Sequence, residues 1–195
     1  MHRVMAPWPE AGLRSGGVLL RPWQPRDVDA WLVLASDPEM FRWSPLTRVP
    51  DRAWVTERIE KAVREAAAGT PSSFAAVDAD RPDQVLGSVD WRNGYPTPPF
   101  SVIDVGYGVA SAARGRGVGS TALRLLTEWL LSPDGGDVHR VQLDHAVGNV
   151  ASCRTALRAG FPVEGRRPCY LPLREDPTSP VVRHAVCLHG RVRVQ

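Results

Sequence analysis

The sequence has few of the features that mark secreted, metal-binding or membrane-spanning proteins. Its 195 residues include only three cysteines, Cys153, Cys169 and Cys187, and no C-x-x-C pair. An odd number of widely spaced cysteines indicates neither a disulfide framework nor a zinc site, so we expect no metal. No apolar run approaches the roughly 20 residues that span a bilayer, and the N-terminus lacks the apolar core of a signal peptide. We therefore expect a cytoplasmic protein without a membrane partner.

The sequence also lacks a large excess of positive or negative charge. The net charge is +3 and the isoelectric point is about 9.0, with the arginines spread along the chain rather than gathered in a run. This balance favours anionic ligands only weakly, and nucleic acid is not expected as a partner. The length suffices for one domain with a sizeable core, and no internal repeat is visible. We expect a loose arm over residues 1–17, one domain over residues 18–190 and a tail over residues 191–195.

The most informative stretch lies in the middle of the chain. Residues 102–109 are apolar and rich in β-branched side chains, which predicts a strand. After a short loop, three glycines alternate with Arg116 and Val118 over residues 115–119. From Val118 to Trp129 the apolar residues follow helical spacing, which predicts an amphipathic helix. The stretch is therefore interpreted as a strand, a glycine-rich turn and a helix.

The glycine-rich turn predicts an anion-binding site. The first amide groups of a helix have no intrahelical partner and carry the positive end of its dipole. Glycines let the backbone approach a ligand closely, and Arg114 and Arg116 add fixed charge. The ligand is expected to be a phosphate or pyrophosphate. The turn is not a Walker loop, because no Gly-Lys-Ser/Thr follows, and it departs from the dinucleotide fingerprint because Ser120 stands where the third glycine falls.

The rest of the chain predicts alternating strands and helices. Further strands are expected near residues 18–21, 74–77, 85–91, 138–147, 161–165 and 181–188. Further helices are expected at residues 28–35, ended by Asp37-Pro38, after an N-cap at Asp51, and from Asn149. Residues 41–50, 93–99 and 166–180 are expected to be loops. The order predicts a mixed α/β sheet with helices on both faces, and Gly106 and Gly108 indicate a bulge or a close backbone approach in the central strand.

Several segments together resemble one enzyme family. Residues 114–119, Arg-Gly-Arg-Gly-Val-Gly, are similar to the acetyl-coenzyme A loop of the GCN5-related N-acetyltransferases (GNAT), which reads Gln or Arg, two residues, Gly, one residue, then Gly or Ala. Asn149 and Ser152, followed by Gly160-Phe161, resemble a second element of that family. Residues 104–107, Asp-Val-Gly-Tyr, resemble a strand of its ribosomal-protein N-terminal (RimJ/RimL-like) branch. The resemblance covers roughly residues 18–190.

The resemblance implies a fold and a cosubstrate site. The implied fold is a single-domain α/β structure with a mixed, mostly antiparallel sheet of six or seven strands, splayed between the fourth and fifth strands. Acetyl-coenzyme A would lie in that gap, with its pantetheine arm against Val109 and Asn149. A plain helix N-cap is the alternative role for Asn149. The implied cosubstrate-binding residues are Val109, Ala110, Arg114, Gly115, Arg116, Gly117, Val118, Gly119, Ser120, Asn149 and Ser152.

The activity implied is transfer of an acetyl group from acetyl-coenzyme A to a primary amine by direct attack in a ternary complex. Asp104 is the candidate base, directly or through water. A carboxylate that only attracts a cationic amine, or makes a structural hydrogen bond, is the alternative. Tyr170 is the candidate acid, and a backbone N–H near Val109 or Ala110 is the candidate oxyanion donor. His145 is expected either to face the cleft or to be a strand residue whose ring forms its hydrogen bonds within the fold.

The identity of the acceptor stays open at this point. A protein N-terminus and a small amine are both compatible with the sequence, and the pocket would come from residues 38–50, 93–100 and 166–180. A non-catalytic domain that binds acetyl-coenzyme A as a sensor or scaffold is an alternative of another class. An RNA-binding module would rest on the Arg-Gly-Arg-Gly run alone, without an aromatic stacking signature. The oligomeric state is left open between a monomer and a homodimer.

Overall fold

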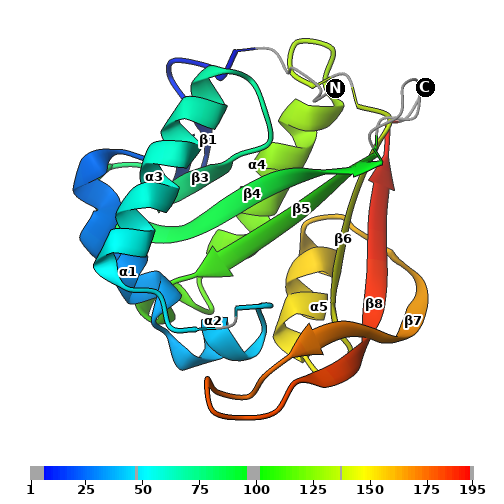
Figure 1. Cartoon of the computed structure of the whole chain (residues 1–195). Coiled ribbons are helices and arrows are strands. Elements are labelled where there is room, and N and C mark those ends of the chain that lie inside the picture. Colours follow the sequence, from blue (N-terminus) through cyan, green and yellow to red (C-terminus); the bar gives the residue numbers. More distant parts are fainter. Residues whose placement is uncertain (1–6, 47, 96–101, 137, 194–195) are drawn as a thin grey trace.

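The alternating strands and helices build one open mixed sheet. The computed structural model describes residues 7–46, 48–95, 102–136 and 138–193. The strand order is β1-β2-β3-β4-β5-β6-β8-β7, and every neighbouring pair is antiparallel except β5 and β6. Figure 1 shows β4 and β5 crossing the molecule toward β6 and β8. The strands are β1 (Leu13–Ser15), β2 (Val18–Pro22), β3 (Ser73–Asp78), β4 (Val85–Tyr95), β5 (Val102–Val109), β6 (Arg140–Ala146), β7 (Val163–Leu173) and β8 (Val182–Val192).

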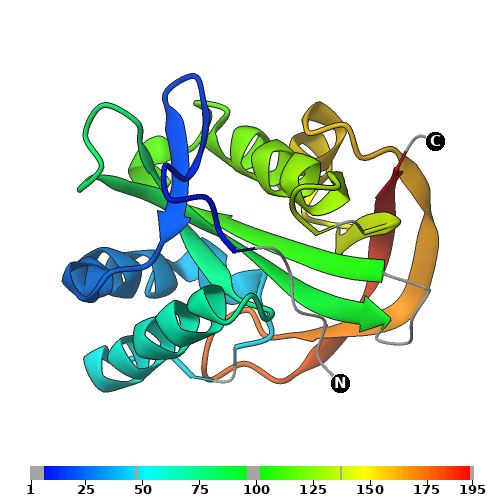
Figure 2. The same cartoon turned by 90° about the horizontal axis from the view of Figure 1, so that it is seen from above.

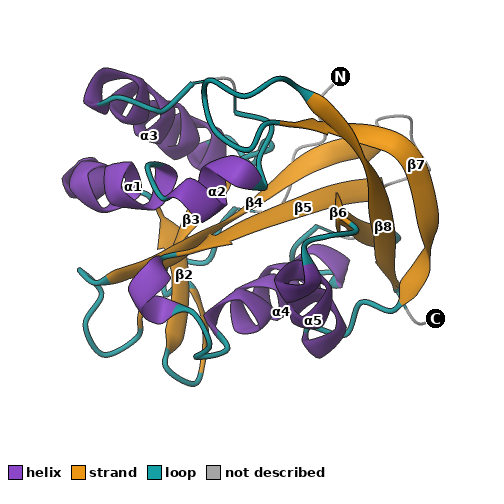
Figure 3. Ribbon diagram, turned by 90° about the horizontal axis from the view of Figure 1, so that it is seen from below, coloured by secondary structure: helices purple, strands orange, loops and turns teal. Residues whose placement is uncertain are grey.

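Helices cover both faces of the sheet, as predicted. Helices α1, α2 and α3 lie on one face, and α4 and α5 lie on the other (Figures 2 and 3). Leu123, Leu126 and Leu130 of α4 are completely buried against the sheet. Among the described residues, no helix is both long and apolar enough to cross a bilayer. The helices are α1 (Val28–Ala35), α2 (Pro38–Arg42), α3 (Arg52–Ala67), α4 (Val118–Leu131) and α5 (Val150–Arg158).

The N-terminal segment is more ordered than the sequence predicts. Within the described residues the sheet has eight strands rather than six or seven, because β1, within the expected loose arm, pairs with β2 from Leu13↔Leu20 onward. Trp8 stacks on Phe74 at 3.8 Å between ring centroids and lies 5.0 Å from Trp129. Trp8 stands alone among prolines and glycines, so no hydrophobic periodicity predicts that it packs. Its partners lie far along the chain.

Two expected loops are partly regular structure. The first is the loop expected over residues 41–50, because α2 extends into it as far as Arg42. Asp37 caps this helix, since its carboxylate accepts a hydrogen bond from the amide of Glu39 (2.9 Å). Residues 166–173, expected in a loop, continue β7 with an irregular register between Arg167 and Leu171. This strand tolerates its prolines because it lies at the edge of the sheet. The last strand also runs to Val192, into the expected tail. Residues 96–99 of the expected hairpin loop lie outside the described residues.

The sheet splits between β5 and β6. These strands pair only at Val102↔Arg140, Ile103↔Val141 and Asp104↔Gln142, and they diverge beyond that point (Figure 1). The split falls between the fourth and fifth of the strands expected from the sequence, which confirms the predicted splay. It exposes one side of the second half of β5.

Of the two explanations expected for the glycines of β5, a bulge or a close approach, the structure supports the close approach. Pairing of β4 with β5 is regular across Gly106 and Gly108. The two glycines instead allow close approaches. A Cβ at Gly106 would lie 2.7 Å from Oδ1 of Asp90, and one at Gly108 would lie 2.6 Å from Cε of Met40. The missing side chains therefore make room for groups on the face covered by α1, α2 and α3.

A buried ion pair fastens the start of the domain, and its loss is expected to be costly. Arg21 and Asp27 form two hydrogen bonds of 2.7 and 2.9 Å with both side chains at most 10% exposed. Asp27→Ala would leave an uncompensated guanidinium, so we expect a loss of about 3–5 kcal/mol in the free energy of unfolding, measured with urea. Asp80→Ala, which removes an exposed pair with Arg14, should cost no more than about 1 kcal/mol. Equal losses in the two variants would contradict this prediction.

Candidate functional site

The split in the sheet opens into a cleft of about 550 Å³. Its walls come from the glycine-rich turn before α4, the first turn of α5, helix α2 and the diverging strands. The cleft brings together most of the residues that the sequence assigned to one ligand, including Val109, Asn149 and Ser152. It also brings in side chains from β4, α2 and β6 that the sequence did not single out.

The glycine-rich turn adopts the backbone predicted for an anion cradle. Gly115 and Gly117 have φ values of +77° and +80°, in the left-handed region that disfavours side chains. Gly117 is the N-cap of α4. Gly119 packs tightly, because a Cβ there would lie 3.0 Å from the ring of Tyr107. The turn therefore directs the first amide groups of α4, which have no intrahelical partner, along the wall of the cleft.

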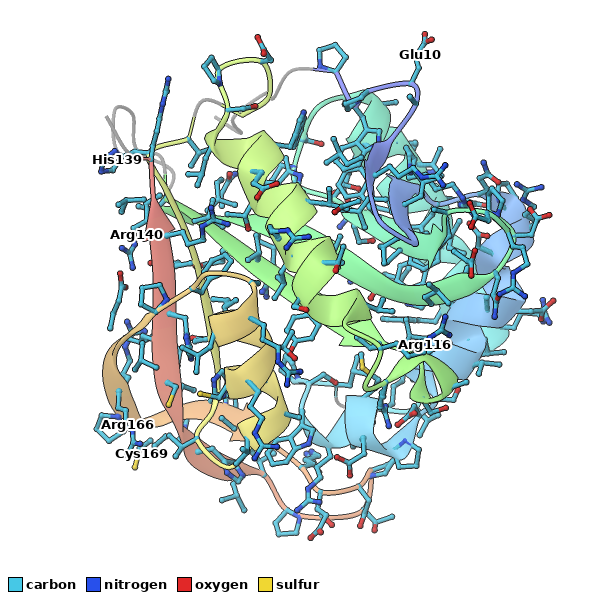
Figure 4. All side chains as sticks on the ribbon, turned by 180° about the vertical axis from the view of Figure 1, so that it is seen from behind. Glu10, Arg116, His139, Arg140, Arg166 and Cys169 are labelled. Atoms are coloured by element: carbon cyan, nitrogen blue, oxygen red, sulfur yellow. The ribbon has the colours of Figure 1, made fainter. Side chains whose placement is uncertain are left out.

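The two arginines of the turn have different surroundings. Nη2 of Arg114 lies 2.8 Å from Oδ2 of Asp37, so this side chain links the turn to α2. Burial raises the pKa of Asp37, but the hydrogen bonds from Arg114 and from the Glu39 amide outweigh it and hold the pKa below its ordinary value. Arg116 is exposed beside the turn (Figure 4). The predicted pair of anion-binding arginines thus becomes one exposed guanidinium and one that also positions the turn.

Two hydroxyl groups meet on the α5 side of the cleft. Oδ1 of Asn149 accepts a hydrogen bond from the Ser152 amide (3.0 Å), so the N-cap role of Asn149 is present. The hydroxyl of Tyr107 donates to Oγ of the buried Ser152 at 3.1 Å. Both residues line the cleft. Sequence reasoning gave Tyr107 no functional role, because its partner lies 45 residues away in the chain.

Acidic side chains line the opposite wall. Glu39 of α2 and Asp90 of β4 both face the cleft. Oδ2 of Asp90 lies 3.1 Å from Nε of Arg92. Burial raises the pKa of Asp90 above 3.8, and the positive charges of Arg92 and Arg58 only partly offset this effect. The sequence analysis did not identify Asp90. The signal that could have found it is Gly106, which pairs with Asp90 on the next strand and leaves room for its carboxylate.

A further carboxylate, Asp144, lines the cleft from β6. Partial burial raises its pKa, and the negative charge of Asp104 adds to the shift, while Arg167 opposes it. Asp104 itself lies at the last β5–β6 pair, where its Oδ1 accepts a hydrogen bond from Nε2 of Gln142 at 2.8 Å. Asp104 is not among the residues that line the cleft.

The structure does not bring Tyr170 to the cleft. This side chain lies on the edge strand β7, is 45% exposed and has the guanidinium of Arg167 4.3 Å from its ring centre. Its neighbour Leu171 lines the cleft instead, as expected because successive side chains of a strand point to opposite faces. Of the three segments expected to form an acceptor pocket, residues 38–45 contribute most, and residues 96–100 lie outside the described residues.

The backbone distinguishes between the two candidate oxyanion donors. The amide of Ala110 donates to the carbonyl of Leu86 at 2.9 Å, so it is already used within the sheet. Because amide groups alternate between the two sides of a strand, the amide of Val109 points to the other side, where β6 has diverged. Val109 thus remains the candidate donor.

The family follows from a direct match. Residues 18–162 match the family model described as an acetyltransferase (GNAT) domain. The chain therefore belongs to the GNAT acetyltransferases, which confirms the resemblance seen in its glycine-rich turn. No curated protein matches the sequence.

Solved structures support the fold. A ribosomal-protein-S5-alanine acetyltransferase from Vibrio fischeri has a TM-score of 0.73 at 18% identity, covering 94% of this chain and 97% of its own. RimJ of Mycobacterium smegmatis, in complex with CoA-disulfide, has a TM-score of 0.74 at 21% identity, covering 98% and 90%. The Microcin C7 self-immunity acetyltransferase MccE, in complex with acetyl-CoA and AMP, has a TM-score of 0.76 at 16% identity, covering 95% and 98%. At these identities the likeness establishes the fold alone.

Proposed function

We propose that this protein transfers an acetyl group from acetyl-coenzyme A to a primary amine. The observation that carries the proposal is the composition of the cleft. The cleft combines the glycine-rich turn at the N-terminus of α4 with the carboxylates of Asp90 and Asp144. A cosubstrate with a pyrophosphate fits the turn, and a cationic amine fits the carboxylates. The solved relatives that hold acetyl-CoA or CoA-disulfide support the choice of cosubstrate.

The proposed contacts to acetyl-coenzyme A follow from groups that the fold leaves open. The pyrophosphate would accept hydrogen bonds from the amides of residues 117–120, with Arg116 nearby. The pantetheine arm, which carries two amides, would take the place of a paired strand along β5 beyond Asp104, because β6 no longer pairs there. The side chain of Asn149 would complete that arm's hydrogen bonds while its Oδ1 caps α5.

The proposed chemistry is direct attack. The neutral amine nitrogen forms a bond to the thioester carbonyl carbon, and the carbonyl oxygen becomes an oxyanion that accepts a hydrogen bond from the Val109 amide. The amine gives its proton to Asp90, directly or through water, and the C–S bond breaks. The thiolate takes a proton from the Tyr107–Ser152 hydroxyl pair. We thus assign the base to Asp90 rather than Asp104, and the proton donor to this pair rather than Tyr170.

The proposed acceptor is a protein N-terminus, with a small primary amine as the second candidate. An α-amino group has a pKa of about 7.7–8.0, so a weak base such as a carboxylate suffices near neutral pH. The fold relatives point the same way, since two of them are named as a ribosomal-protein acetyltransferase and as RimJ. MccE, named as a self-immunity acetyltransferase, is the reason to retain a small amine in the test.

The proposal is tested by calorimetric titration with acetyl-coenzyme A, followed by thiol release with an amine panel. The panel contains peptides with a free α-amine, the same peptides blocked at the N-terminus but carrying lysine, and polyamines. We expect micromolar binding and thiol release with the free α-amine peptides. Failure of the folded protein to bind acetyl-coenzyme A would overturn the proposal. Binding without turnover on any amine would favour the non-catalytic sensor instead.

A further inference from the structure

Two histidines and a cysteine converge beside the cleft. His145 of β6, His189 of β8 and Cys153 of α5 each place one ligand atom within 4.8 Å of the other two. The histidines are 6% and 0% exposed, and the cysteine is half-buried. The three residues come from separate elements that the fold packs together. No step of the proposed acetyl transfer uses them.

Hydrogen bonds determine which ring nitrogens carry protons. Nδ1 of His145 lies 2.8 Å from the carbonyl oxygen of Ala146, and Nδ1 of His189 lies 2.9 Å from that of Phe161. A carbonyl oxygen only accepts hydrogen bonds, so both Nδ1 atoms carry a proton. Both Nε2 atoms of the neutral rings then present lone pairs. These two atoms lie 3.1 Å apart in a buried site, so the facing lone pairs need a proton or a metal ion between them.

We propose that His145, His189 and Cys153 bind a divalent metal ion of the zinc type, through the two Nε2 atoms and the thiolate. Tetrahedral zinc with Zn–N bonds of 2.0–2.1 Å holds two nitrogen ligands about 3.3 Å apart, close to the observed separation. The carbonyl oxygens that fix both Nδ1–H groups are the usual outer partners of metal-binding histidines.

The ion would join two elements of the cleft wall, α5 and β6, to the neighbouring strand β8. It would tie α5 to β6 and β8, and His145 itself lines the cleft. Helix α5 begins beside Asn149 and carries Ser152, so the ion would hold these groups in place. Three protein ligands also leave one position of a tetrahedral ion open. The sequence indicated no metal because the spacing of residues 145, 153 and 189 matches no metal-binding motif.

The test uses the full chain, stripped with a chelator and titrated with Co²⁺. We expect one equivalent to bind, with visible bands of tetrahedral cobalt and a thiolate-to-cobalt charge-transfer band that Zn²⁺ abolishes by displacement. Zn²⁺ should also raise the melting temperature by several degrees. Cys153→Ser should lose the charge-transfer band and weaken cobalt binding by more than about 100-fold. Cys169→Ser, on the exposed part of β7 (Figure 4), should behave as the wild type.

A second measurement does not depend on variants. Zn²⁺ should protect Cys153, but not Cys169, from alkylation by iodoacetamide, as followed by peptide mass spectrometry.

Absence of a tetrahedral cobalt spectrum in the wild type would overturn the proposal, and the histidine pair would then be assigned a shared proton. An unchanged charge-transfer band in Cys153→Ser would exclude this ligand set. Neither outcome depends on whether the protein transfers acetyl groups.

Discussion

Replacing Gly117 by aspartate is expected to weaken acetyl-coenzyme A binding by at least about 100-fold. The carboxylate would stand at the N-cap of α4, where the positive end of the helix dipole and the first amides are proposed to hold the pyrophosphate. Two unit charges 4 Å apart repel by about 4 kcal/mol at an effective dielectric of 20. A 100-fold loss requires only about 2.8 kcal/mol. Isothermal titration of the wild type and the variant gives the ratio directly.

The charge effect can be separated from backbone strain. Gly117 has a φ of +80°, so any side chain there is strained, although asparagine and aspartate tolerate this region better than other residues. Gly117→Asn has nearly the shape of aspartate without its charge and should bind within about tenfold of the wild type. Gly16→Asp places the same residue at a left-handed glycine with open space around it and should leave binding unchanged. Wild-type affinity in Gly117→Asp would remove the anion cradle from the proposed function.

The cosubstrate half of the cleft could be predicted because its signals are local. The strand, the turn with Gly115 and Gly117, and the helix stripe all lie within about 30 consecutive residues, and the backbone conformation required there restricts the sequence. What the local pattern could not show is how the turn is supported. Arg114 pairs with Asp37, far away in the sequence, and the Ala110 amide is taken by Leu86 of another strand.

The acceptor half depends on long-range pairing, which explains why its residues were missed or misplaced. Asp90 and Asp144 lie on strands that are not neighbours in the sheet, and only the split between β5 and β6 brings them to one cleft. Tyr170 illustrates the opposite error. Prolines near it predict a loop, but an edge strand accepts them, and the resulting alternation places Leu171 in the cleft instead. Trp8, in the expected loose arm, packs against the core in the same non-local way.

Asp90→Asn is expected to lower kcat by about 10²–10⁴-fold on the best acceptor of the panel, because this is the usual contribution of a general base. The matched variant is Asp104→Asn, which removes a carboxylate outside the cleft lining and should lower kcat by less than about tenfold. The wild-type rate should fall as the pH drops through the raised pKa of Asp90, since only the ionised form accepts the proton. That part of the pH profile should be absent from Asp90→Asn. Thiol release measured across pH gives all of these values.

Stability distinguishes loss of a base from loss of structure. The pKa of Asp90 is raised in the folded protein, so its ionised form is disfavoured there, and stability is lost as pH rises from the unfolded value of 3.8 through the folded one. Asp90→Asn removes that loss and should unfold at a higher urea concentration than the wild type at pH 7. An inactive but more stable variant would mark a group kept for function at a cost to the fold. If Asp104→Asn instead loses more activity than Asp90→Asn, the base is Asp104, acting through water, and the carboxylates of the cleft serve to attract the amine.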